Sequence, residues 1–366
     1  MRSVLLLLCL VCGALSAQQS VGIFTFPNQG IVWDPDSVQN GITGSEEAVI
    51  YVGQELANLG YRVVVFGSPP EGSRYRASDA NPRYVSHDQA DSTIFDIAIS
   101  WRQADAAARL KKRARTVYLW PHDTFHWQLP AALVDGFDDV LWLSQWQRDQ
   151  WISVNPRFAK FTHIFGNGIV PDQFQPIKAR TNPYACIYGS NYARGLEHLL
   201  DIWPQVKERF PLATLDIYYG WQHWGLLSPE KETKLRNQVA TLPGVRDHGR
   251  VGHEELNRAY EQASLWTYPC TAPECFPITA LRAQLAGAVP VIIEGTGLSG
   301  VVRGGHKCAQ AADYLPTLLQ AMERAEKISL EERQQLGQFV MNEFTWKAVA
   351  TRWKDLFDAT LEERKP

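Results

Sequence analysis

The sequence contains few cysteines, and none of them stand in a metal-binding pattern. Beyond the N-terminal segment only Cys186, Cys270, Cys275 and Cys308 remain, too few and too scattered for a disulfide framework in a chain of 366 residues. No Cys-x-x-Cys pair or Cys/His cluster has zinc spacing, so we expect no metal site. Cys270 and Cys275 could pair across the loop that separates them, or both could be free thiols.

The sequence also lacks an excess or a run of charge of one sign. Its net charge is −3, and charged residues make up 20% of the chain. This balance argues against a nucleic-acid partner or an anionic membrane surface. The sequence has no Asn-x-Ser/Thr acceptor either, so N-glycosylation cannot show whether the protein enters the secretory pathway.

Long apolar runs are missing as well, since Val4 to Cys12 is too short to span a bilayer comfortably. With Arg2 before it and Leu15-Ser16-Ala17 after it, this run is typical of a cleaved signal peptide. We therefore predict a signal peptide over residues 1–17 and a location in the secretory lumen or outside the cell. If the signal is not used, the protein stays in the cytoplasm. No stable membrane span is expected.

The remainder of the chain alternates between short apolar strands and amphipathic helices. The expected strands are 21–26, 62–66, 94–100, 116–120, 139–143, 184–188, 213–219, 265–268 and 289–293, and 245–251 is expected to be a short strand with a loop. A chain of this length exceeds one ordinary core. We expect two doubly wound, Rossmann-like α/β domains facing each other across a cleft. The predicted boundaries are 18–172 for the first domain, 173–343 for the second, and 344–366 for a C-terminal helix that crosses back to the first domain.

One stretch, residues 265–293, organises the second domain. An apolar strand ends before Pro269, and a loop carries Glu274. Pro277 suits the first helical position, and Gly287 suits the end of the helix. A loop at the carboxyl end of a parallel strand, opening onto a helix N-terminus, is a common binding place for anionic ligands.

At this point the chain resembles the retaining GT-B glycosyltransferases of family 4, the group 1 glycosyl transferases. Four segments carry the resemblance, in the family's order, across nearly all of residues 21–357. They are Gly44-Ser45-Glu46, Gly166-Asn167-Gly168-Ile169, Arg194-Gly195, and Pro273-Glu274-x-Phe276 with Ala286-Gly287-x-x-Pro290-Val291-Ile292.

The resemblance implies transfer of a sugar, with retention and without a metal or cofactor, from a nucleotide-sugar donor to a carbohydrate, lipid or protein acceptor. Catalytic roles fall on Glu274, which would contact sugar hydroxyls, and on His122, which the first domain would present to the transferred sugar. Donor-binding roles fall on Arg194, Gly44 and Ser190, on the backbone of Phe276, Pro277 and Ile278, and on the loop holding Gly249 and Val251, which would set the choice of base.

Arg282 departs from the family pattern, which has a second glutamate eight residues after the first. Many members also carry an arginine near Ser190. One interpretation is that a diphosphate-binding cation has moved from Ser190 to Arg282. The other is a surface arginine on an amphipathic helix.

Two further functions remain open from the sequence. One is a non-catalytic relative that binds a sugar or nucleotide. The other is a GT-B-fold epimerase acting on the nucleotide-sugar, although the sequence shows no dedicated pair of carboxylates for ring acid–base chemistry.

Overall fold

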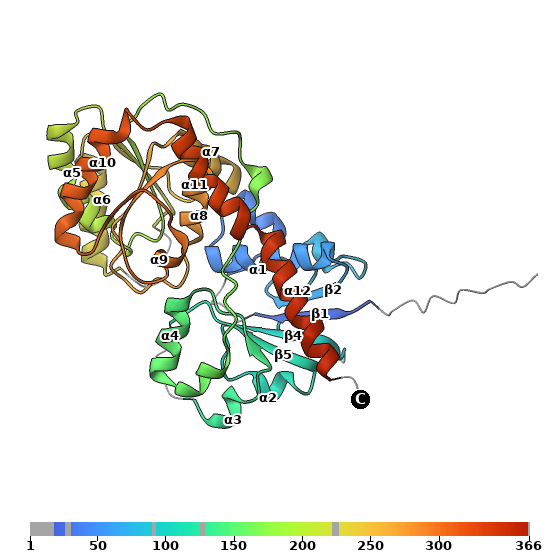
Figure 1. The fold of residues 1–366 in the computed structure, drawn as a ribbon. Helices are drawn as coiled ribbons and strands as arrows, with labels where there is room; N and C mark the ends of the chain where they lie inside the picture. The colour runs from blue at the N-terminus through green and yellow to red at the C-terminus, as the bar shows by residue number, and fades with distance from the viewer. Residues whose placement is uncertain (1–17, 26–30, 90–92, 125–128, 222–226, 365–366) are drawn as a thin grey trace, which may run out of the picture.

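The computed structural model describes residues 18–25, 31–89, 93–124, 129–221 and 227–364. The predicted signal peptide lies outside these ranges. In the described part, two six-stranded parallel sheets form two stacked α/β domains (Figure 1). The fold class predicted from the sequence is therefore confirmed.

The first sheet has the strand order β3-β2-β1-β4-β5-β6. Its strands are β1 (Ser20–Phe24), β2 (Arg62–Gly67), β3 (Arg83–Ser86), β4 (Phe95–Trp101), β5 (Ala114–Trp120) and β6 (Asp139–Val140). The helices of this half are α1 (Gly44–Asn58), α2 (Ala107–Leu110), α3 (Ala131–Val134) and α4 (Gln145–Val154). The order in which strands are added to the sheet reverses between β1 and β4, and ligands of such sheets bind at the carboxyl ends of these strands.

The second sheet repeats this topology in the order β12-β11-β10-β7-β8-β9. Its strands are β7 (Ala185–Gly189), β8 (Thr214–Tyr218), β9 (Val245–Asp247), β10 (Leu265–Tyr268), β11 (Val289–Ile293) and β12 (His306–Cys308). The helices are α5 (Leu196–Arg209), α6 (Pro229–Thr241), α7 (His253–Gln262), α8 (Ile278–Leu285), α9 (Leu298–Val301), α10 (Tyr314–Ala325) and α11 (Leu330–Glu343). The corresponding point of reversal lies between β7 and β10.

The last helix, α12 (Trp346–Glu363), leaves the second domain and runs along the first (Figure 1). Its apolar stripe is buried there: the Trp353 ring meets that of Trp120 at 4.8 Å, and Phe357 meets Tyr118 at 4.7 Å. At its start, Ile169 and Thr345 form an isolated β-bridge next to Gly168, where a Cβ would come within 2.5 Å of the Trp346 nitrogen. Because Gly168 has no side chain, the segment that enters the second domain and the segment that leaves it run in contact.

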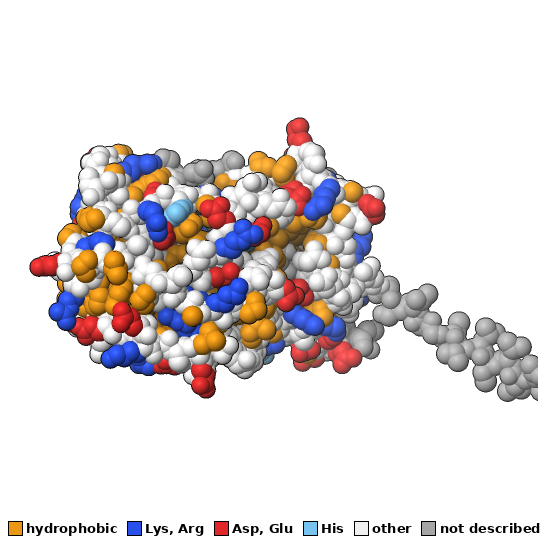
Figure 2. All heavy atoms as spheres, turned by 90° about the horizontal axis from the view of Figure 1, so that it is seen from above, with side chains coloured by type: hydrophobic (Ala, Val, Ile, Leu, Met, Phe, Trp, Pro, Cys, Tyr) orange, Lys and Arg blue, Asp and Glu red, His pale blue; other side chains and the backbone are white. Residues whose placement is uncertain are grey.

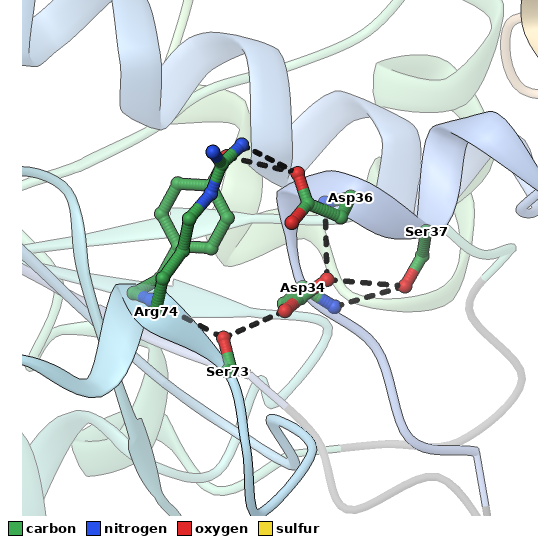
Figure 3. Close-up of polar contacts among 6 residues, drawn as sticks. Asp34, Asp36, Ser37, Ser73 and Arg74 are labelled. Atoms are coloured by element: carbon green, nitrogen blue, oxygen red, sulfur yellow. Dashed lines mark hydrogen bonds and ion pairs between the residues drawn. The ribbon is translucent and has the colours of Figure 1, made fainter.

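The Asp34-Pro35-Asp36 segment forms a capped turn in the loop after β1 (Figure 3). Asp34 caps the 3-10 helix Pro35–Gln39, accepting from the Asp36 N–H at 3.0 Å and from the Ser73 hydroxyl at 2.6 Å. Asp36 pairs with Arg74 at 2.7 Å. The two carboxylates therefore join the loop after β1 to the loop after β2, and hold both in place.

The surface mixes charges of both signs. On the face shown in Figure 2, basic and acidic side chains alternate without a large patch of either sign, in keeping with the small net charge. No helix in the described part of the chain is long and apolar enough to cross a membrane. Cys186, Cys270, Cys275 and Cys308 are all free and buried, so the Cys270–Cys275 pair is not formed.

Candidate active site between the two sheets

A cavity of about 500 Å³ lies between the carboxyl ends of the two sheets. The predicted site residues that line it are Gly44, His122, Ser190, Arg194, Glu274, Phe276, Pro277, Ile278 and Arg282. These positions come from both domains and span most of the sequence. The loops after β5, β7 and β10 therefore converge as their strand ends require.

Glu274 lies in the loop between β10 and α8, on the wall supplied by the second domain. Its Oε2 forms an ion pair with the Arg194 guanidinium at 2.9 Å and accepts a hydrogen bond from the Tyr268 hydroxyl at 2.9 Å. Arg194 also donates to the Pro273 carbonyl at 3.0 Å, and the Glu274 carbonyl accepts from the Gly297 N–H at 2.7 Å. The carboxylate is thus held by its side chain and by its backbone.

The position of Arg194 depends on the glycine that follows it. Gly195 has φ +98°, and a Cβ there would come within 2.2 Å of the Pro269 carbonyl oxygen. Only glycine fits this close approach at that backbone angle. Burial acts to lower the pKa of Arg194, but the neighbouring Glu274 carboxylate raises it above the usual value, so the side chain stays cationic. The pKa of Tyr268 is raised by burial and then by Glu274, so its hydroxyl stays protonated.

Helix α8 begins at this wall, with Pro277 as its N-cap and Ile278 as its first residue. The first N–H groups of a helix have no acceptor within it, and they carry the positive end of the helix dipole. Phe276, Pro277, Ile278 and Thr279 line the cavity. The predicted strand–loop–helix is confirmed, although Pro277 lies one position before the first helical residue. Gly287 follows the helix with φ +75°, as a C-terminal glycine does.

His122 faces the cavity from the first domain, after β5. Its ring meets the edge of Trp120 at 4.5 Å, and its Nε2 is buried without a hydrogen-bond partner in the described residues. Burial, followed by the charge of Arg102, holds the pKa of His122 well below its usual value of 6.5. A neutral imidazole with a free ring nitrogen is suited to hydrogen-bond a hydroxyl group.

Sequence reasoning missed three features of the first-domain wall. Arg102 makes a bidentate ion pair with Asp123, with both N–O distances 2.6 Å. Asn167 is 2% exposed, and its Oδ1 has no partner in the described structure. Glu47 is 5% exposed and carries a carboxylate to the cavity. The Gly166-Asn167-Gly168 motif gave a signal for Asn167, but nothing in the sequence pointed to Arg102.

The loop after β9 only partly fulfils its predicted role. Val251 lines a smaller cavity of about 50 Å³, which shares Ile42, Gly189 and Tyr219 with the larger one. Gly249 lines neither cavity. Its N–H donates to the Asp247 carboxylate at 2.9 Å, and its carbonyl accepts from the Tyr219 N–H at 2.9 Å. The predicted donor-binding role of Gly249 stays a prediction, and its backbone hydrogen bonds order the loop that holds Val251.

Arg282 is not a surface residue. It is 3% exposed, and its guanidinium donates to Glu47 of the first domain at 2.9 Å and to Asn257 of α7. The interpretation of Arg282 as a surface arginine is therefore wrong, because α8 is packed between the two domains at this point. The residue does line the cavity, as a donor-site residue should.

The site thus combines Arg194, Glu274 and the α8 N-terminus on the second domain with His122 on the first, between two Rossmann-like domains. Comparison with solved structures supports this fold. A sucrose-phosphate synthase of Thermosynechococcus elongatus superimposes with a TM-score of 0.73 at 14% identity, covering 94% of this chain and 100% of that one. The Anabaena protein HepE, in complex with UDP and glucose, gives 0.70 at 13% identity, with 93% and 100% covered. A glycosyltransferase of Rickettsia africae gives 0.72 at 12% identity, with 94% and 99% covered.

At the level of sequence, residues 183–326 match the model of the family described as glycosyl transferases group 1. This range covers most of the second domain, including Arg194, Glu274 and α8. The resemblance to the group 1 glycosyl transferases is confirmed over this range. A comparison with curated proteins finds no match.

Proposed function

We propose that this protein is a glycosyltransferase that moves a sugar, with retention of configuration, from a nucleotide-sugar to a carbohydrate, lipid or protein acceptor. The observation that carries the proposal is the grouping of Glu274, Arg194 and the α8 N-terminus on one wall of a cavity between two Rossmann-like domains. The match of this domain to group 1 glycosyl transferases supports the same reaction.

The chemistry follows from the charge that develops during transfer. As the bond between sugar and diphosphate breaks, the leaving nucleoside diphosphate gains negative charge. Arg194 and the first N–H groups of α8 are placed to stabilise that charge without rearranging. Because these groups supply positive charge directly, we propose that transfer does not require a metal, and turnover in excess EDTA tests this.

The sugar would lie between the two domains. Glu274 would accept hydrogen bonds from its hydroxyls, oriented by Arg194 and Tyr268. His122 would approach from the first domain as a neutral hydrogen-bonding group. Retention asks little more of the side chains, because leaving-group stabilisation and acceptor positioning supply much of the rate. The predicted signal peptide further suggests that the reaction takes place in the secretory pathway, where a donor would have to be supplied.

Incubation of the purified protein with UDP-, GDP- and ADP-sugars tests the proposal. A transferase hydrolyses its correct donor slowly when no acceptor is present. An isomerised donor would instead identify an epimerase, and binding without turnover would identify a non-catalytic relative. UDP-glucose is the first donor to test, because HepE was solved with UDP and glucose.

A further inference from the structure

The Arg282–Glu47 ion pair joins the two walls of the cavity. Arg282 belongs to α8 of the second domain and Glu47 to the first turn of α1, and their atoms Nη2 and Oε1 lie 2.9 Å apart. Only 4% and 6% of the two side chains are exposed. Both residues also line the cavity, so the pair lies at the place where the domains face each other.

Neighbouring groups on both domains support the pair. The second oxygen of Glu47 lies 3.5 Å from His253 Nε2, and the other ring nitrogen of His253 lies 3.2 Å from the Tyr51 hydroxyl. Tyr51 exchanges a hydrogen bond with Gln173, which lies between the domains. On the Arg282 side, Asn257 takes the second guanidinium contact. The network thus crosses from α1 to α7 and α8.

The adjacent loops meet without room for a side chain. A Cβ on Gly252 would come within 2.1 Å of the Gln39 carbonyl oxygen, and one on Gly41 within 2.3 Å of the Val251 carbonyl oxygen. Backbone from the two domains is therefore in direct contact beside the smaller cavity. The ion pair and these close approaches fix the separation of the walls at this end.

The pair also weakens the case for Arg282 as a phosphate ligand. Both terminal nitrogens of Arg282 are already engaged, one by Glu47 and the other by Asn257, and only 4% of its side chain is exposed. Arg194 also faces a carboxylate, but 29% of its side chain is exposed, so it can still contact a ligand.

We infer that Arg282 and Glu47 are a positioning pair that holds the two domains closed over the donor cavity, and that Arg282 acts through Glu47 and not on the diphosphate. This inference rests on the proposed function for its link to donor binding. Its structural part, closure of the domains, stands independently of any donor.

Two single variants and their combination test the inference. Glu47→Gln keeps the side-chain shape and removes the charge. Arg282→Met keeps a long side chain and removes the cation. The double variant leaves no unpaired charge. Glu323→Gln is the matched control, since it breaks an exposed pair with Arg209 within the second domain, 3.2 Å long.

The first measurement is the radius of gyration by small-angle X-ray scattering, without nucleotide. We expect Glu47→Gln and Arg282→Met to be more open than the wild type, because each leaves a buried group unpaired. The control should scatter as the wild type does. The second measurement is the Kd for whichever of UDP, GDP and ADP binds the wild type most tightly.

Both single variants should bind that nucleotide at least about tenfold more weakly, a change of about 1.4 kcal/mol. The double variant should bind the nucleotide no more weakly than the weaker-binding single variant. The effects of two residues that act as a pair overlap, whereas the effects of independent contacts add. If a single variant fails to fold, a double variant that folds supports the pair. If both single variants fold and the double variant binds the nucleotide more weakly than either, the inference is overturned.

Opposite results separate the competing explanations. If Arg282 contacts the diphosphate directly, Glu47→Gln frees the guanidinium and binding stays equal or becomes tighter, which overturns the inference. Normal scattering together with normal nucleotide binding in both single variants overturns it as well, while leaving the proposed function intact. If no nucleotide binds the wild type but the single variants open, the proposed function fails and the positioning pair stands.

Discussion

Replacing Glu274 by glutamine tests the centre of the proposed site. The substitution keeps the size of the side chain and one carbonyl oxygen, but it removes the negative charge that faces Arg194 at 2.9 Å. A hydrogen bond to a charged group contributes about 1.5–3 kcal/mol. With about 1.4 kcal/mol for each factor of ten, kcat/KM should fall about 10- to 150-fold.

The assay is hydrolysis of the donor that the wild type accepts, measured as the release of the nucleoside diphosphate. Glu323→Gln serves again as control, because its exposed pair with Arg209 should contribute no more than about 1 kcal/mol and lies away from the cavity. Thermal unfolding of each variant checks that folding is intact. A Glu274→Gln enzyme with kcat/KM within about twofold of the wild type would show that Glu274 does not hold the transferred sugar, and the site assignment would be wrong.

Three further predictions concern the first domain and its C-terminal helix. Asn167→Ala should lower donor turnover without lowering the unfolding temperature, because the Oδ1 it removes has no partner in the described structure; a loss of stability would contradict this reasoning. His122 has a depressed pKa when folded, so the unfolded chain takes up a proton near pH 6.5 that the folded protein does not. The free energy of unfolding of the wild type should therefore be flat above that pH and fall below it. Urea unfolding at pH 7.5 and 5.5 should show a smaller fall for His122→Asn than for the wild type. Trp353→Ala removes a fully buried ring and should cost about 3–5 kcal/mol in urea unfolding, whereas Met341→Ala, at a side chain 44% exposed, should change stability by about 0.5 kcal/mol or less.

The local structure of the donor wall was predictable from sequence because short-range rules govern it. The apolar strand before Pro269, the proline at the start of α8 and the glycine after it each act within a few residues. The alternation of strands and helices likewise predicts two doubly wound sheets, and the topology then brings the loops after β7 and β10 together.

The bounds of helices and the contacts of loop residues were less predictable where tertiary contacts decide them. The segment 103–113 is helical by composition, yet only Ala107–Leu110 forms a helix. At its start Gln103 is hydrogen-bonded to Ser100 and Thr25, and at its end β5 begins at Ala114. Gly249 follows a strand of the right kind, and its carbonyl accepts a hydrogen bond from the N–H of Tyr219, in the loop after β8. Such choices depend on partners distant in the chain.

Arg282 shows most clearly what the sequence determined and what only the tertiary structure decided. The sequence alone placed an arginine on α8, eight residues after Glu274, and therefore on a helix beside an anion-binding loop. It could not supply the partner, because Glu47 lies 235 residues away in the other domain. Whether a charge on a helix faces solvent, a ligand or a buried carboxylate is decided by the surface packed against that helix, and here the surface belongs to α1.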